Sequence, residues 1–189
     1  MAITYTTRRG NTYYLHTGPK RGGGIQHFVS THPEGASADS IPAGFEFYET
    51  PNGQVYLRRK KSALIGPSEL ALVERALLKR VTSGRSYLAE ISGEKIIIHE
   101  GDTHIAALRE FNTRFTASVL EDYAVRNAHY TPVMRFVVCD KVRRVFAPER
   151  YCFRGSVEDW IPIGEPDQLQ RLASKYLKHL GTDSIYELY

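Results

Sequence analysis

The sequence predicts an α+β fold, in which an N-terminal pair of β-hairpins precedes a mixed body of antiparallel hairpins and about three helices. Three observations predict this class. Short aromatic and β-branched segments, separated by turn residues, fill residues 1–61. Apolar residues recur at helical spacing in three later segments. The helical segments do not alternate regularly with single strands, so a parallel βαβ sheet is not indicated.

The first predicted hairpin joins strands at residues 11–17 and 25–30. Both segments are short and rich in aromatic and β-branched residues, as strands are. The tip between them is basic at Lys20 and Arg21 and flexible at residues 22–24, which are all glycine. No helix signal follows these glycines, so they match neither a P-loop nor a dinucleotide fingerprint.

The second predicted hairpin joins residues 45–49 to residues 54–59. Pro51, Asn52 and Gly53 lie between these segments and suit a type I turn that ends in a glycine bulge. This turn makes the second hairpin the clearer of the two.

The body begins with a helix from Ser68 to about Gly84, followed by a hairpin of residues 87–91 and 95–99. A long helix is expected from Thr103, which can act as its N-cap. Poor helix formers at residues 112–116 predict a break in that helix.

The remaining chain reads as strands at residues 133–139, 142–146 and 150–154, followed by a C-terminal helix. Pro166 suits the start of that helix and Gly181 its end. The apolar stripe of the helix consists of Leu169, Leu172, Tyr176 and Leu177.

Charge divides the chain at the same place as the secondary-structure pattern. Residues 1–61 hold eight Lys or Arg residues against four acids, and the rest of the chain is balanced at 17 against 17. We therefore expect a basic aromatic hairpin module at residues 1–61 and an α+β body at residues 66–189. The sequence leaves open whether the two pack as one unit.

Composition predicts a folded, cytoplasmic protein, since 42% of residues are hydrophobic and 24% are charged. No apolar run approaches the ~20 residues of a membrane span, and no secretory signal opens the chain, so we expect no membrane. Cys139 and Cys152 are too few for a disulfide framework. We expect both to be reduced core residues, with a cross-strand bridge as the alternative.

The basic aromatic module favours DNA or RNA as a partner, because arginine and lysine contact phosphates while aromatic rings stack on bases. This predicts a small non-catalytic nucleic-acid-binding protein. The predicted phosphate contacts are Arg8, Arg9, Lys20, Arg21, Arg58 and Arg59, and the predicted stacking residues are Tyr13, Tyr14 and Tyr56.

Two other interpretations fit the same module. Small sheets need aromatic residues for their own core, and edge strands use Lys and Arg to prevent aggregation. The aromatic sheet also suits a protein–protein adaptor or a homodimer, with Trp160 or Tyr189 as an anchor.

Catalytic residue types are densest at His99, Glu100, Asp102 and His104. A metal-dependent hydrolase or nuclease using these residues is a further alternative. The two histidines are five residues apart, however, and zinc proteases need two histidines at positions i and i+4 of a helix. Asp102 beside a Thr103 cap also suits a helix N-terminus without catalysis.

A metal site at His16, His27 and His32 would need facing strands to bring these imidazoles together. No carboxylate lies between Met1 and Pro33 to orient them. The chain contains no Cys-x-x-Cys or His-x-His pair and no nuclease hairpin of the acid-x-Lys kind. We therefore expect no metal and no cofactor, and favour a protein without catalytic activity.

Overall fold

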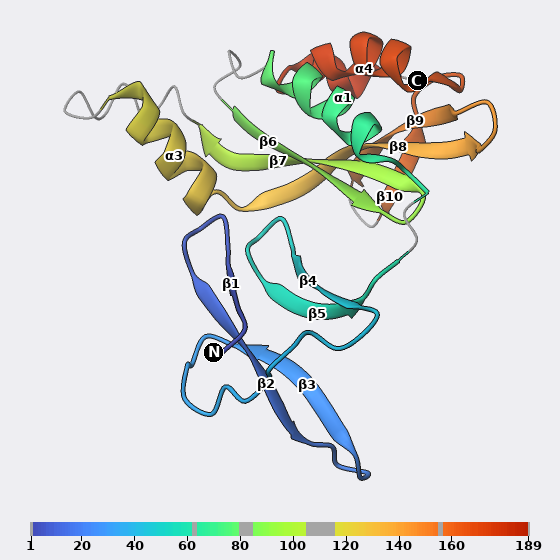
Figure 1. Ribbon diagram of the computed structural model, residues 1–189. Helices are drawn as coiled ribbons and strands as arrows, with labels where there is room; N and C mark the ends of the chain where they lie inside the picture. Colours follow the sequence, from blue (N-terminus) through green and yellow to red (C-terminus); the bar gives the residue numbers. More distant parts are fainter. Residues whose placement is uncertain (1, 62–63, 80–84, 105–115, 155–156, 189) are drawn as a thin grey trace. The chain divides into compact units, whose positions relative to one another are not determined.

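The computed structural model describes residues 2–61, 64–79, 85–104, 116–154 and 157–188. These residues form antiparallel sheets and three α-helices, so the α+β class is confirmed. The chain divides into two compact units, Met1–Lys61 (unit 1) and Ser62–Tyr189 (unit 2) (Figure 1). Among the described residues, no helix has the length and apolar character required to cross a membrane.

Unit 1 contains both N-terminal hairpins. A three-stranded antiparallel sheet has the order β1-β2-β3, and a separate two-stranded sheet is formed by β4 and β5. The strands are β1 (Thr4–Thr6), β2 (Thr12–Pro19), β3 (Ile25–Ser30), β4 (Phe45–Glu49) and β5 (Val55–Arg59). Leu15 of β2 is fully buried and Val55 of β5 is 4% exposed, so these apolar side chains belong to the small core of unit 1.

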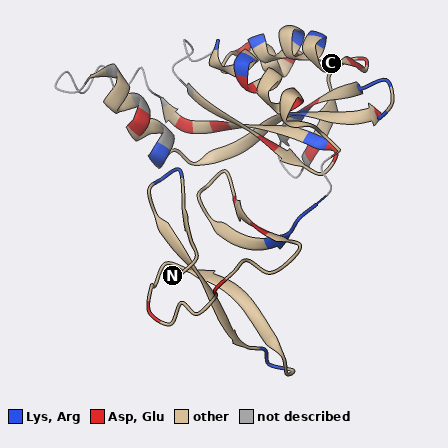
Figure 2. Cartoon of the chain, viewed as in Figure 1, with Lys and Arg blue, Asp and Glu red and all other residues tan. Residues whose placement is uncertain are grey.

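The β4–β5 turn follows its sequence signal. Gly53 has a φ of 80°, and its N–H donates to the Thr50 carbonyl at 2.9 Å. A residue with a side chain is strained at such a φ, which explains the glycine. Figure 2 shows basic residues of unit 1 at the β1–β2 turn, at the tip of the β2–β3 hairpin and at the end of β5.

Unit 2 is built on a six-stranded antiparallel sheet of order β10-β9-β8-β7-β6, in which the short β11 also pairs with β9. Its strands are β6 (Arg85–Ser92), β7 (Lys95–His104), β8 (Tyr130–Asp140), β9 (Val145–Arg154), β10 (Val157–Pro162) and β11 (Asp167–Gln168). Its helices are α1 (Pro67–Leu78), α3 (Ala117–Asn127) and α4 (Leu169–Tyr176), with 3₁₀ turns η2 (Leu177–His179) and η3 (Asp183–Glu187).

Helices α1 and α4 lie on one face of this sheet (Figure 1). Strand alternation sends Ile96, Ile98 and Phe136 to that face, where each is fully buried. The apolar stripe of α4 packs against them, and Tyr176 is 2% exposed. The stripe predicted for the C-terminal helix is therefore buried as expected, in the main core of unit 2.

The structure differs from the sequence-based expectations at two helix starts. Thr103 lies within β7 and is not a helix cap. Residues 105–115, where most of the first part of the expected helix falls, lie outside the described residues, and the next described helix is α3, from Ala117. The C-terminal helix begins at Leu169 and not at Pro166, because Asp167 and Gln168 pair with β9. In both cases residues expected at the beginning of a helix pair with a neighbouring strand instead. This pairing is a long-range contact, so the local sequence does not indicate it.

One cysteine also differs from expectation. Cys139 was expected in the core, but it is exposed because its side chain leaves the face of β8 opposite to that of the buried Val138. Trp160 lies in strand β10, and its ring contacts Tyr151 edge-on at 5.1 Å. Both cysteines are free, so the alternative of a bridge between them is wrong.

Glu69 ties α1 to the β8–β9 turn. Its carboxylate accepts hydrogen bonds from Arg144 Nε at 2.9 Å and from the Gly66 backbone N–H at 2.9 Å. Burial alone would raise the pKa of Glu69, but these bonds and the charge of Arg144 outweigh it and lower the pKa below its usual value. Arg144 has a φ of 54°, so the ion pair also offsets a strained backbone.

We expect Glu69→Gln to lower the free energy of unfolding of unit 2 at pH 7 by about 1–2 kcal/mol, because glutamine keeps the bond from Gly66 and loses the charged pair with the half-exposed Arg144. A lowered pKa stabilises the fold above the unfolded-state value of about 4.3, and this stabilisation disappears as the pH falls through the folded-state pKa. The difference between variant and wild type should therefore shrink below about pH 4. Urea unfolding followed by Trp160 fluorescence measures it.

The control is Glu165→Gln, which removes an exposed carboxylate of unit 2. Its stability should follow wild type at every pH. Equal behaviour of the two variants would contradict the stabilising role of the Glu69–Arg144 pair.

Candidate functional sites

The predicted catalytic cluster lies along β7, where alternation separates its members. His99 is opposite Leu88, and Glu100 is opposite Tyr87, so the two side chains leave opposite faces of the sheet. His99 is 7% exposed, and its Nε2 donates to the Glu90 carboxylate at 3.1 Å. That contact satisfies Nε2 without catalysis, while Nδ1 is buried and has no hydrogen-bond partner among the described residues.

The other two members of the cluster do not complete a site. Asp102 accepts a hydrogen bond from the backbone N–H of His129 at 2.8 Å, which anchors the end of α3 to β7. The side chain of His104 lies outside the described residues. Among the residues that the structure describes, no group of three or more His, Cys, Asp or Glu residues is arranged to hold a metal ion.

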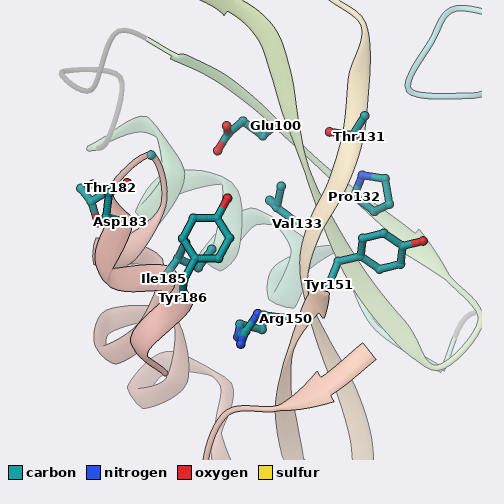
Figure 3. Close-up of a pocket in the computed structure, with 11 residues that line it drawn as sticks. Glu100, Thr131, Pro132, Val133, Arg150, Tyr151, Thr182, Asp183, Ile185 and Tyr186 are labelled. Carbon is teal, nitrogen blue, oxygen red and sulfur yellow. The ribbon is translucent and has the colours of Figure 1, made fainter. Parts of the chain in front are cut away.

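Glu100 instead lines a pocket of about 520 Å³ on the helix-covered side of the sheet (Figure 3). The pocket lies between the start of β8, the middle of β9 and the η3 segment. Arg150, Asp183 and Tyr186 line it with Glu100, and sequence reasoning proposed none of these three for a site. They are separated by 30 residues or more from Glu100, and no local motif connects them.

The three-histidine site of unit 1 does not form. His16 is opposite Phe28 and His27 is opposite Thr17, so the two imidazoles leave opposite faces of the β2–β3 hairpin. His16 is 6% exposed, stacks on Phe28 with ring centroids 5.2 Å apart, and contacts the His32 carbonyl oxygen through Nε2 at 3.0 Å. The condition for a metal site here is therefore not met, because the register places Thr17, and not His16, opposite His27.

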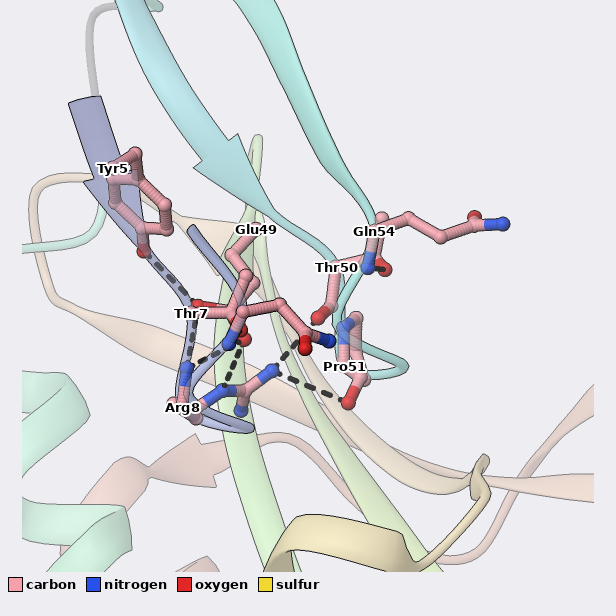
Figure 4. Close-up of polar contacts among 8 residues, drawn as sticks. Tyr5, Thr7, Arg8, Glu49, Thr50, Pro51 and Gln54 are labelled. Atoms are coloured by element: carbon pink, nitrogen blue, oxygen red, sulfur yellow. Dashed lines mark hydrogen bonds and ion pairs between the residues drawn. The ribbon is translucent and has the colours of Figure 1, made fainter. Parts of the chain in front are cut away.

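Arg8, a predicted phosphate contact, is used inside unit 1 (Figure 4). Its Nε donates to Glu49 at 3.0 Å, and its Nη2 donates to the carbonyl oxygens of Thr50 at 2.7 Å and Pro51 at 3.2 Å. The Glu49 side chain is 6% exposed and also accepts from the Tyr5 hydroxyl at 3.1 Å. Arg8 therefore neutralises a buried carboxylate that joins β1 to the β4–β5 turn.

The same carboxylate affects Tyr5. Burial, the hydrogen bond to Glu49 and the negative charge of Glu49 together raise the pKa of Tyr5. The Tyr5 ring also lies 5.4 Å from that of Phe47. Tyr13 is opposite Tyr5 and shares a face with the buried Leu15, so this predicted stacking residue lies on a packed face of the sheet.

Arg58 is paired as well. Its Nε donates to Glu46 at 2.9 Å, and its guanidinium lies 3.9 Å from the centre of the Tyr48 ring. Tyr56 is opposite Tyr48 and is 50% exposed, so its ring remains open on this face of the hairpin. Arg59 lies on the other face, 5.9 Å from the Phe45 ring.

The β2–β3 tip carries exposed basic side chains. Lys20 and Arg21 are both exposed, and no ion pair involves either among the described residues. Hydrogen bonds from Gly23 N–H to the Lys20 carbonyl (2.9 Å) and from Lys20 N–H to the Gly24 carbonyl (3.0 Å) fix the turn. Tyr14, on the opposite face from Tyr13, is half-buried.

Comparison of the chain with models of protein families, with curated proteins and with solved structures gave no match in any of the three.

We expect Glu49→Ala to destabilise unit 1 by about 2–3 kcal/mol, because the substitution leaves the Tyr5 hydroxyl and Arg8 without their shared acceptor. Hydrogen–deuterium exchange resolved by peptide measures the effect in β1, β4 and β5 separately from unit 2. The matched control is Glu46→Ala, which removes a more exposed pair with Arg58 and should cost less than about 1 kcal/mol. Equal losses of protection in the two variants would contradict the central role of Glu49.

Proposed function

We propose that unit 1 binds nucleic acid without catalysis, mainly through the β2–β3 hairpin and its basic tip. The proposal rests on a difference in pairing among the basic residues of unit 1. Arg8 and Arg58 are paired with carboxylates, whereas Lys20 and Arg21 are exposed at a turn and have no acidic partner among the described residues. Unpaired cations are the groups that contact phosphates and release counterions.

Exposed aromatic residues in the same unit support the proposal. Tyr56 is 50% exposed and Phe28, in β3, is 44% exposed. A base stacked on such a ring contributes about 1–3 kcal/mol without any sequence code. A two-stranded ribbon is also one of the elements that enter the major groove of DNA. The proposed contacts are Lys20, Arg21 and Arg59 for phosphates and Tyr14, Phe28 and Tyr56 for bases.

A second candidate function is self-association or protein binding through β3. This strand lies at the edge of its sheet, and Ile25 is 74% exposed on it. An apolar edge strand is a template for pairing with another chain. Sedimentation at low and high salt distinguishes this candidate, because an apolar edge contact persists at high salt whereas phosphate contacts weaken.

We expect the full chain to bind fluorescein-labelled 20-nucleotide DNA and RNA in anisotropy titrations at 50 mM salt, and to bind them more weakly at 200 mM, as phosphate contacts require. The double variant K20A/R21A should reduce the affinity at least about tenfold at 50 mM salt. It should also lower the slope of log affinity against log salt by about 2, one unit for each lost phosphate contact.

The matched control is R143A/K178A, which removes two exposed cations from unit 2 and gives the same net charge as K20A/R21A. It should bind as wild type does. If both variants bind equally weakly, the loss of affinity comes from the change in net charge, and the proposed role of the β2–β3 tip is wrong. If the full chain binds no oligonucleotide at 50 mM salt, the whole proposal is wrong.

A further inference from the structure

The pocket in unit 2 has the size of a site for one small molecule. Its volume of about 520 Å³ falls within the range of roughly 300–1,000 Å³ that ligand pockets occupy. Pro132, Val133 and Ile185 give it apolar walls, and Thr131, Thr182 and Tyr186 add hydroxyl groups. The charged side chains that line it are Glu100, Arg150 and Asp183.

Arg150 is the most unusual residue of this pocket. It lies in β9 opposite the fully buried Met134, on the core face of the sheet, and is itself only 9% exposed. The one hydrogen bond of its guanidinium group within the described residues runs from Nε to the Leu188 carbonyl oxygen at 3.5 Å, which is long for this kind of bond. Buried guanidinium groups are normally paired with carboxylates or phosphates, often through two parallel bonds.

The described residues supply no such anion to Arg150. A planar anion that enters the pocket can therefore take this place. A carboxylate suits the site better than a dianionic phosphate, because Asp183 lines the same pocket and forms no ion pair among the described residues.

Glu100 lies away from Arg150. Glu100 is opposite Thr131 and Arg150 is opposite Met134, on the two strands that flank β8, so their backbones are about 10 Å apart along β8 and about 10 Å apart across the sheet. Asp183, at the start of η3, also lies away from Arg150 in Figure 3. Figure 3 shows the side chains of Val133 and Ile185 between Glu100 and Arg150. The pocket thus has a cationic end, an apolar middle and an acidic end.

We propose that this pocket binds a small linear zwitterion, with a carboxylate held by Arg150, an aliphatic chain on Val133 and Ile185, and an ammonium group held by Glu100 and Asp183. Amino acids with a terminal amine and other ω-amino carboxylates have this chemistry. The proposal depends on unit 2 alone and is independent of nucleic-acid binding by unit 1.

The test is calorimetric titration of the full chain with three probes of the same length. 6-Aminohexanoate carries both charges, hexanoate lacks the ammonium group, and hexylamine lacks the carboxylate. We expect 6-aminohexanoate to bind at least about tenfold more tightly than hexylamine, which lacks the contact with the buried Arg150, and several-fold more tightly than hexanoate, which lacks the contact with the more exposed acids. Equal affinities for the three, or no binding of 6-aminohexanoate at about 10 mM, a concentration that detects even millimolar binding, would overturn the proposal.

Variants assign the two ends of the ligand. Arg150→Gln should weaken 6-aminohexanoate and hexanoate about tenfold or more and leave hexylamine unchanged. Asp183→Asn should weaken 6-aminohexanoate and hexylamine by several-fold and leave hexanoate unchanged. The matched control is Glu187→Gln, an exposed acid of the same η3 segment that does not line the pocket, and it should bind all three probes as wild type does.

Arg150 is buried, so its variant must first give the wild-type circular dichroism spectrum and Trp160 fluorescence. If Arg150→Gln does not fold, the rim variant Asp183→Asn decides, because this exposed residue carries no structural hydrogen bond within the described residues. An unchanged ratio of 6-aminohexanoate to hexanoate affinity in Asp183→Asn would overturn the assignment of the acidic end.

Discussion

Burial of one face of the sheet under α1 and α4 is the interaction on which unit 2 depends. Each large apolar side chain removed from water there contributes roughly 1.5–3 kcal/mol. Alternation along β9 sends Phe146, Pro148 and Arg150 to this same face, and all three are buried. Phe146 meets the helices, whereas Arg150 meets the C-terminal segment around Ile185. The same alternation of side chains that forms the core therefore also places the Arg150 guanidinium in the pocket beside the core.

Unit 1 and unit 2 each bury a charged side chain in a different way. Glu49 is surrounded by donors from Tyr5 and Arg8, so its charge is balanced within unit 1 and its role is to hold strands together. Arg150 is as deeply buried, but the described residues give it one long hydrogen bond to a carbonyl oxygen. Removing one partner of a buried ion pair destabilises a fold because it leaves the other charge buried and uncompensated, while an underpaired charge that lines a pocket is a candidate for ligand binding.

Not all of the basic residues among residues 1–61 are available for binding a polyanion, although the sequence alone counts them equally. Two of its cations, Arg8 and Arg58, are matched by acids of the β4–β5 hairpin. The cations without such a match are concentrated at the β2–β3 tip and after β5. These two places are where the basic charge of unit 1 remains exposed to solvent.

The sequence by itself determined the α+β class, the hairpins of unit 1 and the buried stripe of α4, because strand alternation, turn chemistry and helical spacing are local properties. It did not determine that Thr103 belongs to β7, where α4 begins, the exposure of Cys139 or the register that separates His16 from His27. Only the tertiary structure decided these, since they depend on which strand pairs with which. The pocket belongs to the same group: Glu100, Arg150 and Asp183 are distant in the chain, and long-range pairing alone brings them around one cavity.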